Sequence, residues 1–276
     1  MDLPVLIGPT ASGKTELALA LSKKMEIEIV LADSRKVYRY LDIGTAKPTY
    51  GQRQEARFHM FDLKDPDEYF SAGDYGETAE KVIEVILKRS RIPLIVGGSG
   101  LYIETIFNPL PPLPKPDPVL RQEVDNLERK FGLDYLYKRL KKEDPSWASR
   151  IDPNDRQRIK RGLEVIWATG RAMSELLKKR PKPRFRPIFF GISLPRSILK
   201  ERIERRVERM LNDGLIEETE WLLSVGYDVN INALKTIGYQ EVIEFLNNDF
   251  SKTDLRQKIY KNTYTLARRQ TTWFRR

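Results

Sequence analysis

Short apolar runs alternate with helix-like periodic segments along the first hundred residues. The runs at 5–7, 27–31 and 94–96 predict strands, and the segments at 15–25 and 74–90 between them predict helices. Strands that alternate with helices in this way are typical of a parallel sheet covered by helices on both faces. The pattern therefore predicts an α/β fold.

Two proline-rich segments interrupt this pattern. Residues 108–118 contain six prolines in eleven positions, and 179–187 hold a second breaker. Proline cannot continue a helix or an inner strand, so both segments read as stiff hinges. Only helical periodicity appears from 119 to 177, which predicts an all-helical domain inserted at 116–181 into a phosphate-loop (P-loop) core formed by 1–115 and 182–276.

The apolar run at 188–194 predicts a buried strand that returns the chain to the first sheet. After it, periodicity predicts the last helices of the core. They are expected near 196–212, 214–225, 235–247 and 252–275.

Composition narrows the class of protein. A chain of 276 residues can bury a sizeable core, and with no cysteine it has neither a disulfide framework nor a Cys-based zinc site. Its apolar runs are too short to span a bilayer, and no targeting segment precedes the first strand. We expect a cytoplasmic enzyme that is not bound to membranes.

A phosphate-binding loop follows the first predicted strand. It matches G-x-x-x-x-G-K-[ST] in full and consists of Gly8, Pro9, Thr10, Ala11, Ser12, Gly13, Lys14 and Thr15. Its backbone N–H groups and the start of the next helix would hold a phosphate, with Lys14 on a terminal phosphate and the Thr15 hydroxyl on Mg²⁺. The alternative is a Gly-rich turn with a surface lysine. The loop alone does not say which phosphate compound binds.

The net charge of +10 is concentrated in two blocks. Residues 1–110 carry 14 Lys/Arg against 16 Asp/Glu, whereas 155–186 carry 11 against 3 and 251–276 carry 8 against 1. Such blocks attract phosphate backbones, and the aromatic residues Tyr260, Tyr264, Trp273 and Phe274 in the second block could stack on bases. A solvated helix face is the alternative for either block alone. Together they favour a nucleic acid partner.

Asp33 stands at the end of the second predicted strand, where ligands bind in parallel sheets. The carboxylate could act as a general base, hold a metal through water, or cap a helix at 34–38; the local sequence slightly favours the cap. The strand within 93–102 ends in glycines and lacks the terminal acid of an ATP-hydrolysing motor. That absence argues against an ATPase but not against a small-molecule kinase.

Two further patterns are ambiguous. Arg202, Arg206 and Arg209 share one helix face, which by itself reads as a solvated stripe paired with neighbouring glutamates. His59, the one histidine, lies among apolar residues and is expected to be a satisfied, half-buried side chain rather than a catalyst.

Taken together, these segments resemble the bacterial tRNA dimethylallyltransferases, or isopentenyltransferases. Besides the phosphate loop, the similarity rests on Asp-Ser-Arg (33–35), Asp-Ile-Gly-Thr-Ala-Lys-Pro (42–48), Val-Gly-Gly-Ser-Gly-Leu-Tyr (96–102), Pro-Asn-Asp-Arg-Gln-Arg-Ile-Lys-Arg (153–161), Ile-Gly-Tyr (237–239) and Ala-Arg-Arg-Gln-Thr-Thr-Trp-Phe-Arg (267–275). The 42–48 segment and the C-terminal motif are the most specific.

The resemblance implies transfer of a dimethylallyl group from dimethylallyl diphosphate to the exocyclic amine of the adenine 3′ of the anticodon (position 37), in tRNAs that read codons beginning with U. Asp33 would be the base, Thr10, Lys14 and Thr15 would hold the diphosphate and Mg²⁺, and Arg206 would hold the leaving diphosphate. We expect a monomer. The implied tRNA contacts are Asp33, Ser34, Arg35, Lys36, Ser99, Arg121, Gln157, Arg158, Ile159, Lys160 and Arg161.

The chain departs from the family pattern at three places. Lys36 replaces a familiar glutamine, Ser99 replaces a threonine, and Phe58-His59 replaces a pair of histidines. Three other functions fit parts of the sequence: a P-loop kinase of small metabolites, a non-catalytic RNA-binding protein, and an enzyme that prenylates free adenylates. The kinase leaves the basic blocks unexplained, the RNA-binding protein leaves Lys14, Thr15 and Asp33 without a role, and the adenylate enzyme does not need the basic insertion.

Overall fold

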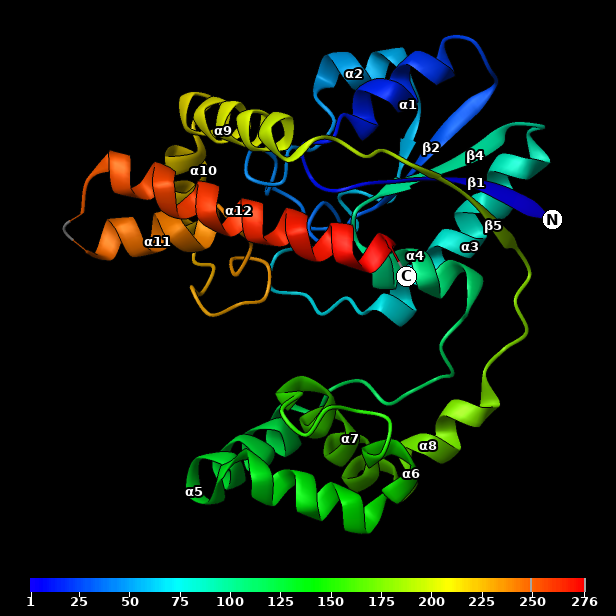
Figure 1. Ribbon diagram of the computed structural model, residues 1–276, viewed down its shortest axis with the longest axis vertical. Coiled ribbons are helices and arrows are strands. Elements are labelled where there is room, and N and C mark those ends of the chain that lie inside the picture. The colour runs from blue at the N-terminus through cyan, green and yellow to red at the C-terminus, as the bar shows by residue number, and fades with distance from the viewer. Residues whose placement is uncertain (249, 276) are drawn as a thin grey trace. The chain divides into compact units, whose positions relative to one another are not determined.

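The computed structural model describes residues 1–248 and 250–275 (Figure 1). The chain forms two compact units, one of Met1–Phe107 with Pro183–Arg276 and one of Asn108–Lys182. The first boundary lies before the proline-rich segment 108–118 rather than within it, where the sequence placed it at 115/116. The reason is local packing, because Leu113 lies against the apolar residues of the second unit and the Pro114 carbonyl accepts a hydrogen bond from Arg161.

A five-stranded parallel sheet forms the centre of the first unit, so the predicted α/β class is confirmed. The strands are β1 (Asp2–Ile7), β2 (Ile27–Ala32), β3 (Phe58–His59), β4 (Ile92–Gly97) and β5 (Arg186–Gly191). Their order is β3-β2-β4-β1-β5. In this register Ile7 lies opposite Gly97, and Ala32 also lies opposite Gly97, so the ends of three strands meet at one edge.

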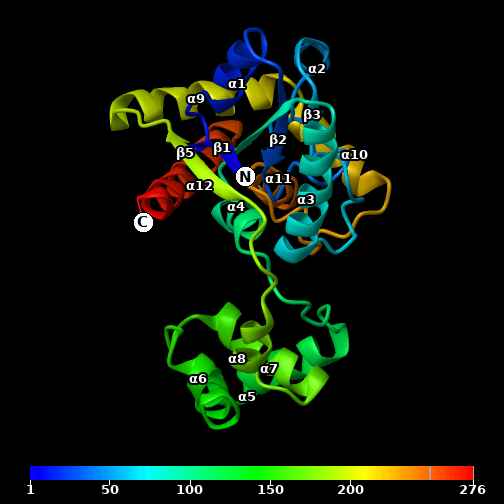
Figure 2. The same ribbon diagram turned by 90° about the vertical axis from the view of Figure 1, so that its right-hand side faces the viewer.

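Helices cover both faces of the sheet, as Figures 1 and 2 show. Val30 and Ala32 of β2 face a large core beneath α3 (Ala72–Lys88) and α4 (Gly100–Phe107). Ile29 and Leu31 of the same strand face the opposite core, beneath α1 (Lys14–Ser22). Burial of both faces explains why this strand is apolar at every position except Glu28 rather than alternating.

The predicted strand at 188–194 rejoins the sheet, but the prediction that it is buried is wrong. β5 pairs with β1 along its whole length and forms the edge of the sheet. Ile188, Phe189 and Phe190 are 47%, 50% and 55% exposed. An apolar run shows that a segment suits a strand, whereas its position in the sheet decides how much of it is covered.

Four of the remaining helices of the first unit agree with the periodicity to within a few residues. They are α9 (Arg196–Asn212), α10 (Leu215–Ser224), α11 (Tyr239–Asn247) and α12 (Lys252–Phe274). Helix α2 (Tyr50–Glu55) and helix α4 were not predicted. A capping box begins α12, with the Ser251 hydroxyl accepting from the Asp254 amide and the Asp254 carboxylate accepting from the Ser251 amide. Along α12, Leu255, Ile259 and Ala267 face the large core.

The second unit consists of helices, as predicted. They are α5 (Pro118–Glu143), α6 (Pro145–Ala148), α7 (Arg156–Thr169) and α8 (Met173–Leu176), followed by a 3₁₀ turn at Leu177–Lys179. Val124, Leu136 and Leu140 of α5 pack against Ile159 and Leu163 of α7. Within the described ranges, no helix combines the length and the apolar character needed to cross a bilayer.

Candidate active site

The phosphate loop joins β1 to α1 at the edge where the strands end. Gly13 adopts φ +94°, a conformation that disfavours other residues, and directly precedes the first residue of α1. The Lys14 ammonium curls back over the loop and donates to the carbonyl oxygens of Gly8 and Pro9, each at 2.8 Å. The lysine is therefore oriented by main-chain oxygens, and within the described part of the chain it forms no ion pair.

The loop also holds a buried polar atom without a partner. Ser12 is 3% exposed, and its hydroxyl finds no hydrogen-bond partner among the described residues. A buried hydroxyl left unpaired costs free energy, so such an atom in a P-loop marks a place for a ligand oxygen. The residues present therefore fit a bound phosphate.

The Asp33 carboxylate has one oxygen engaged in a cap and one that is unbonded within the described chain. One carboxylate oxygen, Oδ1, accepts from the backbone N–H groups of Arg35 at 2.9 Å and of Lys36 at 3.4 Å. This caps a turn, not the helix that was expected at 34–38. The other oxygen has no hydrogen bond within the described chain, so it is available to accept a proton.

Ser34 and Ser99 connect the ends of two strands beside Asp33. The Ser99 hydroxyl accepts from the Ser34 amide at 3.1 Å, and the Ser99 amide donates to the Ala32 carbonyl at 3.2 Å. Beneath them, Tyr75 donates to the Leu31 carbonyl at 3.1 Å and stacks on Tyr102 at 4.2 Å between ring centroids. Burial raises the pKa of the Tyr75 hydroxyl, which therefore stays protonated. The result is a rigid support for Asp33.

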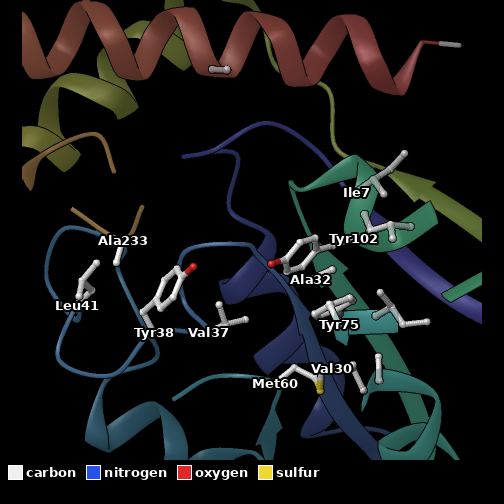
Figure 3. Close-up of a cluster of buried hydrophobic side chains, with 14 of the residues drawn as sticks. Ile7, Val30, Ala32, Val37, Tyr38, Leu41, Met60, Tyr75, Tyr102 and Ala233 are labelled. Atoms are coloured by element: carbon white, nitrogen blue, oxygen red, sulfur yellow. The ribbon is translucent and has the colours of Figure 1, made fainter. Parts of the chain in front are cut away.

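Tyr102 also faces Tyr38, which belongs to the segment that follows Asp33 (Figure 3). Figure 3 shows the hydroxyl groups of Tyr38 and Tyr102 pointing toward one another beyond Ala32. Both tyrosines belong to the large core. Burial also raises the pKa of Tyr102.

Two arginines of α9 reach the site, which corrects the expectation of a solvated stripe. Arg202 donates to the Ser12 carbonyl at 3.2 Å, and Arg206 donates to the Thr45 carbonyl at 3.5 Å. Arg209 is exposed. The local sequence could not reveal this, because the partners lie 190 and 161 residues away in the chain.

Lys36 binds the same segment, 42–48, as Arg206. Its ammonium donates to the Ala46 carbonyl at 2.6 Å, one residue beyond the carbonyl that accepts from Arg206. The segment 42–48 that was recognised as a specific motif thus presents two adjacent carbonyl oxygens to two cations. Ala46 adopts φ +50°, an uncommon conformation for a residue with a side chain.

The helices α10 and α11 hold this segment in place. Glu218 accepts from the backbone N–H groups of Asp42 and Ile43 at 3.2 and 3.1 Å, and the Tyr239 hydroxyl donates to Glu218 at 2.5 Å. Burial raises the pKa of Glu218. Tyr239 also leaves no room for a side chain at Gly44, where a Cβ atom would lie 2.3 Å from its ring.

Desolvation is the dominant electrostatic effect on the site's lysines. It lowers the pKa of Lys14 to about 7, although the charge of Asp33 acts in the opposite direction. It lowers the pKa of Lys36 to about 8, with the same opposing effect of Asp33. The pKa of Arg206 is lowered for the same reason. Positive charge is therefore crowded and poorly solvated here, which favours binding of an anion.

The C-terminal motif contacts the phosphate loop and the segment that follows β4. Gln270 of α12 accepts from the Thr10 amide at 2.8 Å and donates to the Gly98 carbonyl at 3.0 Å. Trp273 packs over Gly100, where a Cβ atom would lie 2.3 Å from its ring. Tyr260, Tyr264 and Phe274 pack against the large core, so these aromatic residues mainly hold α12 to the sheet. The sequence suggested base stacking and missed this structural role.

Comparison with known proteins agrees with this geometry. A family model described as "IPP transferase" matches residues 36–276. The chain belongs to this family. It is 44% identical to the tRNA dimethylallyltransferase of Thermotoga neapolitana, across 100% of this chain and 90% of that protein. It is 42% identical to tRNA dimethylallyltransferase 1 of Syntrophotalea carbinolica, across 98% and 87%.

Solved structures of the IPP transferase family share the fold. The full-length tRNA isopentenylpyrophosphate transferase of Bacillus halodurans matches with a TM-score of 0.70 and 34% identity, across 99% of this chain and 86% of that one. A eukaryotic dimethylallyltransferase described as acting on tRNA matches with a TM-score of 0.81 and 27% identity, across 99% and 69%. The family resemblance and the transferase class inferred from the sequence are thereby confirmed.

In this member of the IPP transferase family, the tRNA contacts expected in the insertion separate into three groups. Gln157 and Arg158 are exposed on α7. Lys160 and Arg161 are engaged within the unit, Lys160 with Asp125 at 2.6 Å and Arg161 with Glu164 at 3.3 Å. Ile159 has no exposed surface, so its assignment as a tRNA contact is wrong and it belongs to the apolar core.

Arg121 is both accessible to RNA and paired within the unit. Its guanidinium is half exposed and pairs with the buried Glu164 at 3.1 Å. Two arginines, Arg121 and Arg161, thus neutralise one buried carboxylate. This pairing holds α5 and α7 together.

Thr15, where the sequence placed a metal ligand, is the second residue of α1, after Lys14. Among the described residues, no group of three or more His, Asp or Glu side chains is placed so that it could hold a metal ion. His59, as expected, is a half-buried side chain with a partner, since its Nε2 lies 2.6 Å from the buried Glu28. Burial lowers the pKa of His59.

Proposed function

We propose that this protein transfers the dimethylallyl group of dimethylallyl diphosphate to tRNA and releases diphosphate. The observation that carries the proposal is the convergence of Lys14, the unpartnered Ser12 hydroxyl and Arg206 beside the Asp33 carboxylate. Lys14 and Arg206 donate to main-chain carbonyls and keep donors for an anion. The names of the Thermotoga and Syntrophotalea relatives support tRNA as the acceptor.

The finer proposal is that the acceptor is the N6 amine of the adenosine at position 37, 3′ of the anticodon, in tRNAs that read codons beginning with U. The lone pair of this amine is delocalised into the adenine ring, so it is a poor nucleophile. As the bond from N6 to the allylic carbon forms and the bond from that carbon to the diphosphate breaks, Asp33 accepts the N6 proton through its free oxygen.

The departing diphosphate gains negative charge and must be met by fixed donors. The loop amides, the Ser12 hydroxyl, Lys14 and Arg206 are the groups in place to do this, with Thr10 and its backbone fixed by Gln270. A Mg²⁺ ion bound by Thr15 and the diphosphate oxygens would neutralise part of the same charge. The phosphate loop thus serves a prenyl diphosphate rather than ATP.

The target base must leave the anticodon loop to reach Asp33, because an amine in a base stack is out of reach of the carboxylate. Asp33, Ser34, Arg35, Lys36 and Ser99 lie at the site itself, whereas the insertion offers exposed cations for the RNA backbone. The protein is proposed to work as a cytoplasmic monomer. No membrane partner is invoked.

The test is to incubate the protein with tRNA, Mg²⁺ and dimethylallyl diphosphate and to analyse the tRNA nucleosides by mass spectrometry. We expect a mass gain on adenosine at position 37 that requires dimethylallyl diphosphate. Free AMP serves as the control acceptor, and its modification in place of tRNA would favour an adenylate enzyme. No modified nucleoside in either case would overturn the proposal.

Titration calorimetry tests the loop separately. Mg²⁺-dependent binding of dimethylallyl diphosphate is expected, with weak binding of ATP. Tight binding of ATP and none of dimethylallyl diphosphate would favour a small-molecule kinase. If the protein bound tRNA but neither ATP nor dimethylallyl diphosphate, the result would favour a non-catalytic RNA-binding protein.

A further inference from the structure

Lys36 occupies an unusual electrostatic position for a residue that the sequence placed in contact with tRNA. Its side chain is only partly accessible, and its one hydrogen bond in the described chain goes to the neutral Ala46 carbonyl at 2.6 Å. An ammonium group has three donors, so up to two remain for another partner. A desolvated cation held by a single neutral acceptor is costly unless an anion completes its surroundings.

The charged neighbours of Lys36 also favour the binding of an anion. Lys14, Arg206 and Lys47 are the cations near it, and Asp33 and Glu16 are the anions. Lys47 is already paired with Asp42 and Asp62, so its charge is compensated. Lys36 and Arg206 also bond to adjacent carbonyl oxygens, those of Ala46 and Thr45, so their charged ends are held side by side. Apart from the paired Lys47, three cations face two carboxylates, so one positive charge is left without a partner until an anion binds.

The geometry points to Lys36 as a third cation for the diphosphate of the prenyl substrate, acting with Lys14 and Arg206, rather than as a contact to tRNA. This inference rests on the proposed function and assigns a specific role to the one position where the Asp-Ser-Arg segment departs from the familiar glutamine. Its ammonium donates to a diphosphate oxygen and keeps its bond to Ala46. The strained backbone at Ala46, held through Glu218 and Tyr239, fixes where that cation stands.

The experiment compares wild-type protein with Lys36→Met and Lys36→Gln. Binding of inorganic diphosphate with Mg²⁺ is measured by titration calorimetry, tRNA binding is measured by filter binding across a salt series, and KM is measured for dimethylallyl diphosphate. Lys88→Met is the matched control, because Lys88 is an exposed lysine at the end of α3 in the same unit. Thermal melting verifies that each variant is folded.

We expect both Lys36 variants to bind diphosphate about 10- to 100-fold more weakly, the range expected for a lost charge-assisted hydrogen bond, and KM to rise in parallel. The Lys36→Gln variant retains a side-chain donor for the Ala46 carbonyl, so a similar loss in this variant assigns the effect to the charge and not to a disturbed loop. Affinity for tRNA and its salt dependence should stay within about twofold of wild type, as in Lys88→Met.

Three results would overturn the inference. The first is unchanged diphosphate binding with weaker, less salt-dependent tRNA binding, which would return Lys36 to the RNA. The second is a wild-type protein that binds neither diphosphate nor dimethylallyl diphosphate, which would remove the proposed function as well. Normal wild-type binding with unaffected Lys36 variants would remove only the role of Lys36.

Discussion

Two basic regions of this protein use their cations in opposite ways. In the first unit, Lys14, Lys36 and Arg206 donate to main-chain carbonyl oxygens and form no ion pairs within the described chain. In the insertion, Lys160 and Arg161 are paired with carboxylates. The first arrangement leaves positive charge without a paired carboxylate until an anion arrives, whereas in the second each of these cations already has a carboxylate partner.

The difference shows that the density of basic residues does not measure binding capacity. Residues 155–186 are the more basic stretch in the sequence, yet several of its cations stabilise the insertion itself. Arg156 and Arg158 also pair with carboxylates, Glu128 at 2.7 Å and Asp155 at 3.4 Å, but their side chains remain 69% and 62% accessible. Those are the residues left for RNA.

The substitution with the largest expected effect is at Asp33, the carboxylate that lies among the unpaired cations of the first unit. Asp33→Asn keeps an oxygen that can accept from the Arg35 amide, so the turn should persist while the base is lost. We expect turnover to fall by about 10²- to 10⁴-fold, with diphosphate and tRNA binding largely retained. Single-turnover kinetics measure this.

Asp65→Asn serves as the control, since Asp65 is an accessible carboxylate that pairs with Arg39 in the same unit. It should leave turnover unchanged. If Asp33→Asn turned over at nearly the wild-type rate but melted at a lower temperature, the capping role of Asp33 would be its whole role.

A smaller effect is expected where cations are already paired. Lys160→Met leaves Asp125 and the nearly covered Glu128 without their lysine, so we expect the insertion to lose about 1–3 kcal/mol of stability. Hydrogen–deuterium exchange of α5 and α7 measures the loss. Lys138→Met, which breaks an accessible pair with Asp134, should change exchange very little, and equal effects in the two variants would contradict the distinction.

The more accessible cations of the insertion should affect RNA binding more than stability, although Arg156 also pairs with Glu128. Replacing Arg156 and Arg158 by alanine is expected to weaken tRNA binding and to lower the slope of log affinity against log salt by about 1 for each lost phosphate contact. Dimethylallyl diphosphate binding should not change. Filter binding over a salt series measures both quantities, and an unchanged slope would mean that this face of α7 is merely solvated.

The smallest effect concerns the two arginines at either side of Arg206 on α9. Arg202 donates to the Ser12 carbonyl in the phosphate loop, so Arg202→Ala should raise KM for dimethylallyl diphosphate by about threefold, the low end for one hydrogen bond. Arg209 is exposed and has no such partner within the described residues. Arg209→Ala should therefore match wild type in steady-state kinetics. Equal KM values for both variants would show that Arg202 does not support the loop.

The sequence by itself determined the fold class, the phosphate loop and the family. Strand β2 was predictable because burial on both faces produces a short, nearly continuous apolar run, and helix α9 because burial of one face repeats apolar positions about every 3.6 residues. The phosphate loop was predictable because its chemistry lies within eight consecutive residues, Gly8 to Thr15. Both signals are local, so they can be read without knowing the fold.

Only the tertiary structure decided which cations are paired and which strand is exposed. Arg206 meets Thr45 across 161 residues, Gln270 meets Thr10 across 260, and the exposure of β5 follows from its place at the sheet edge. The same arginine sequence on α9 would form a solvated stripe if the segment 42–48 were held elsewhere. Hydrogen bonds and charge act between side chains that folding brings together, and no local pattern records which distant segment will supply the partner.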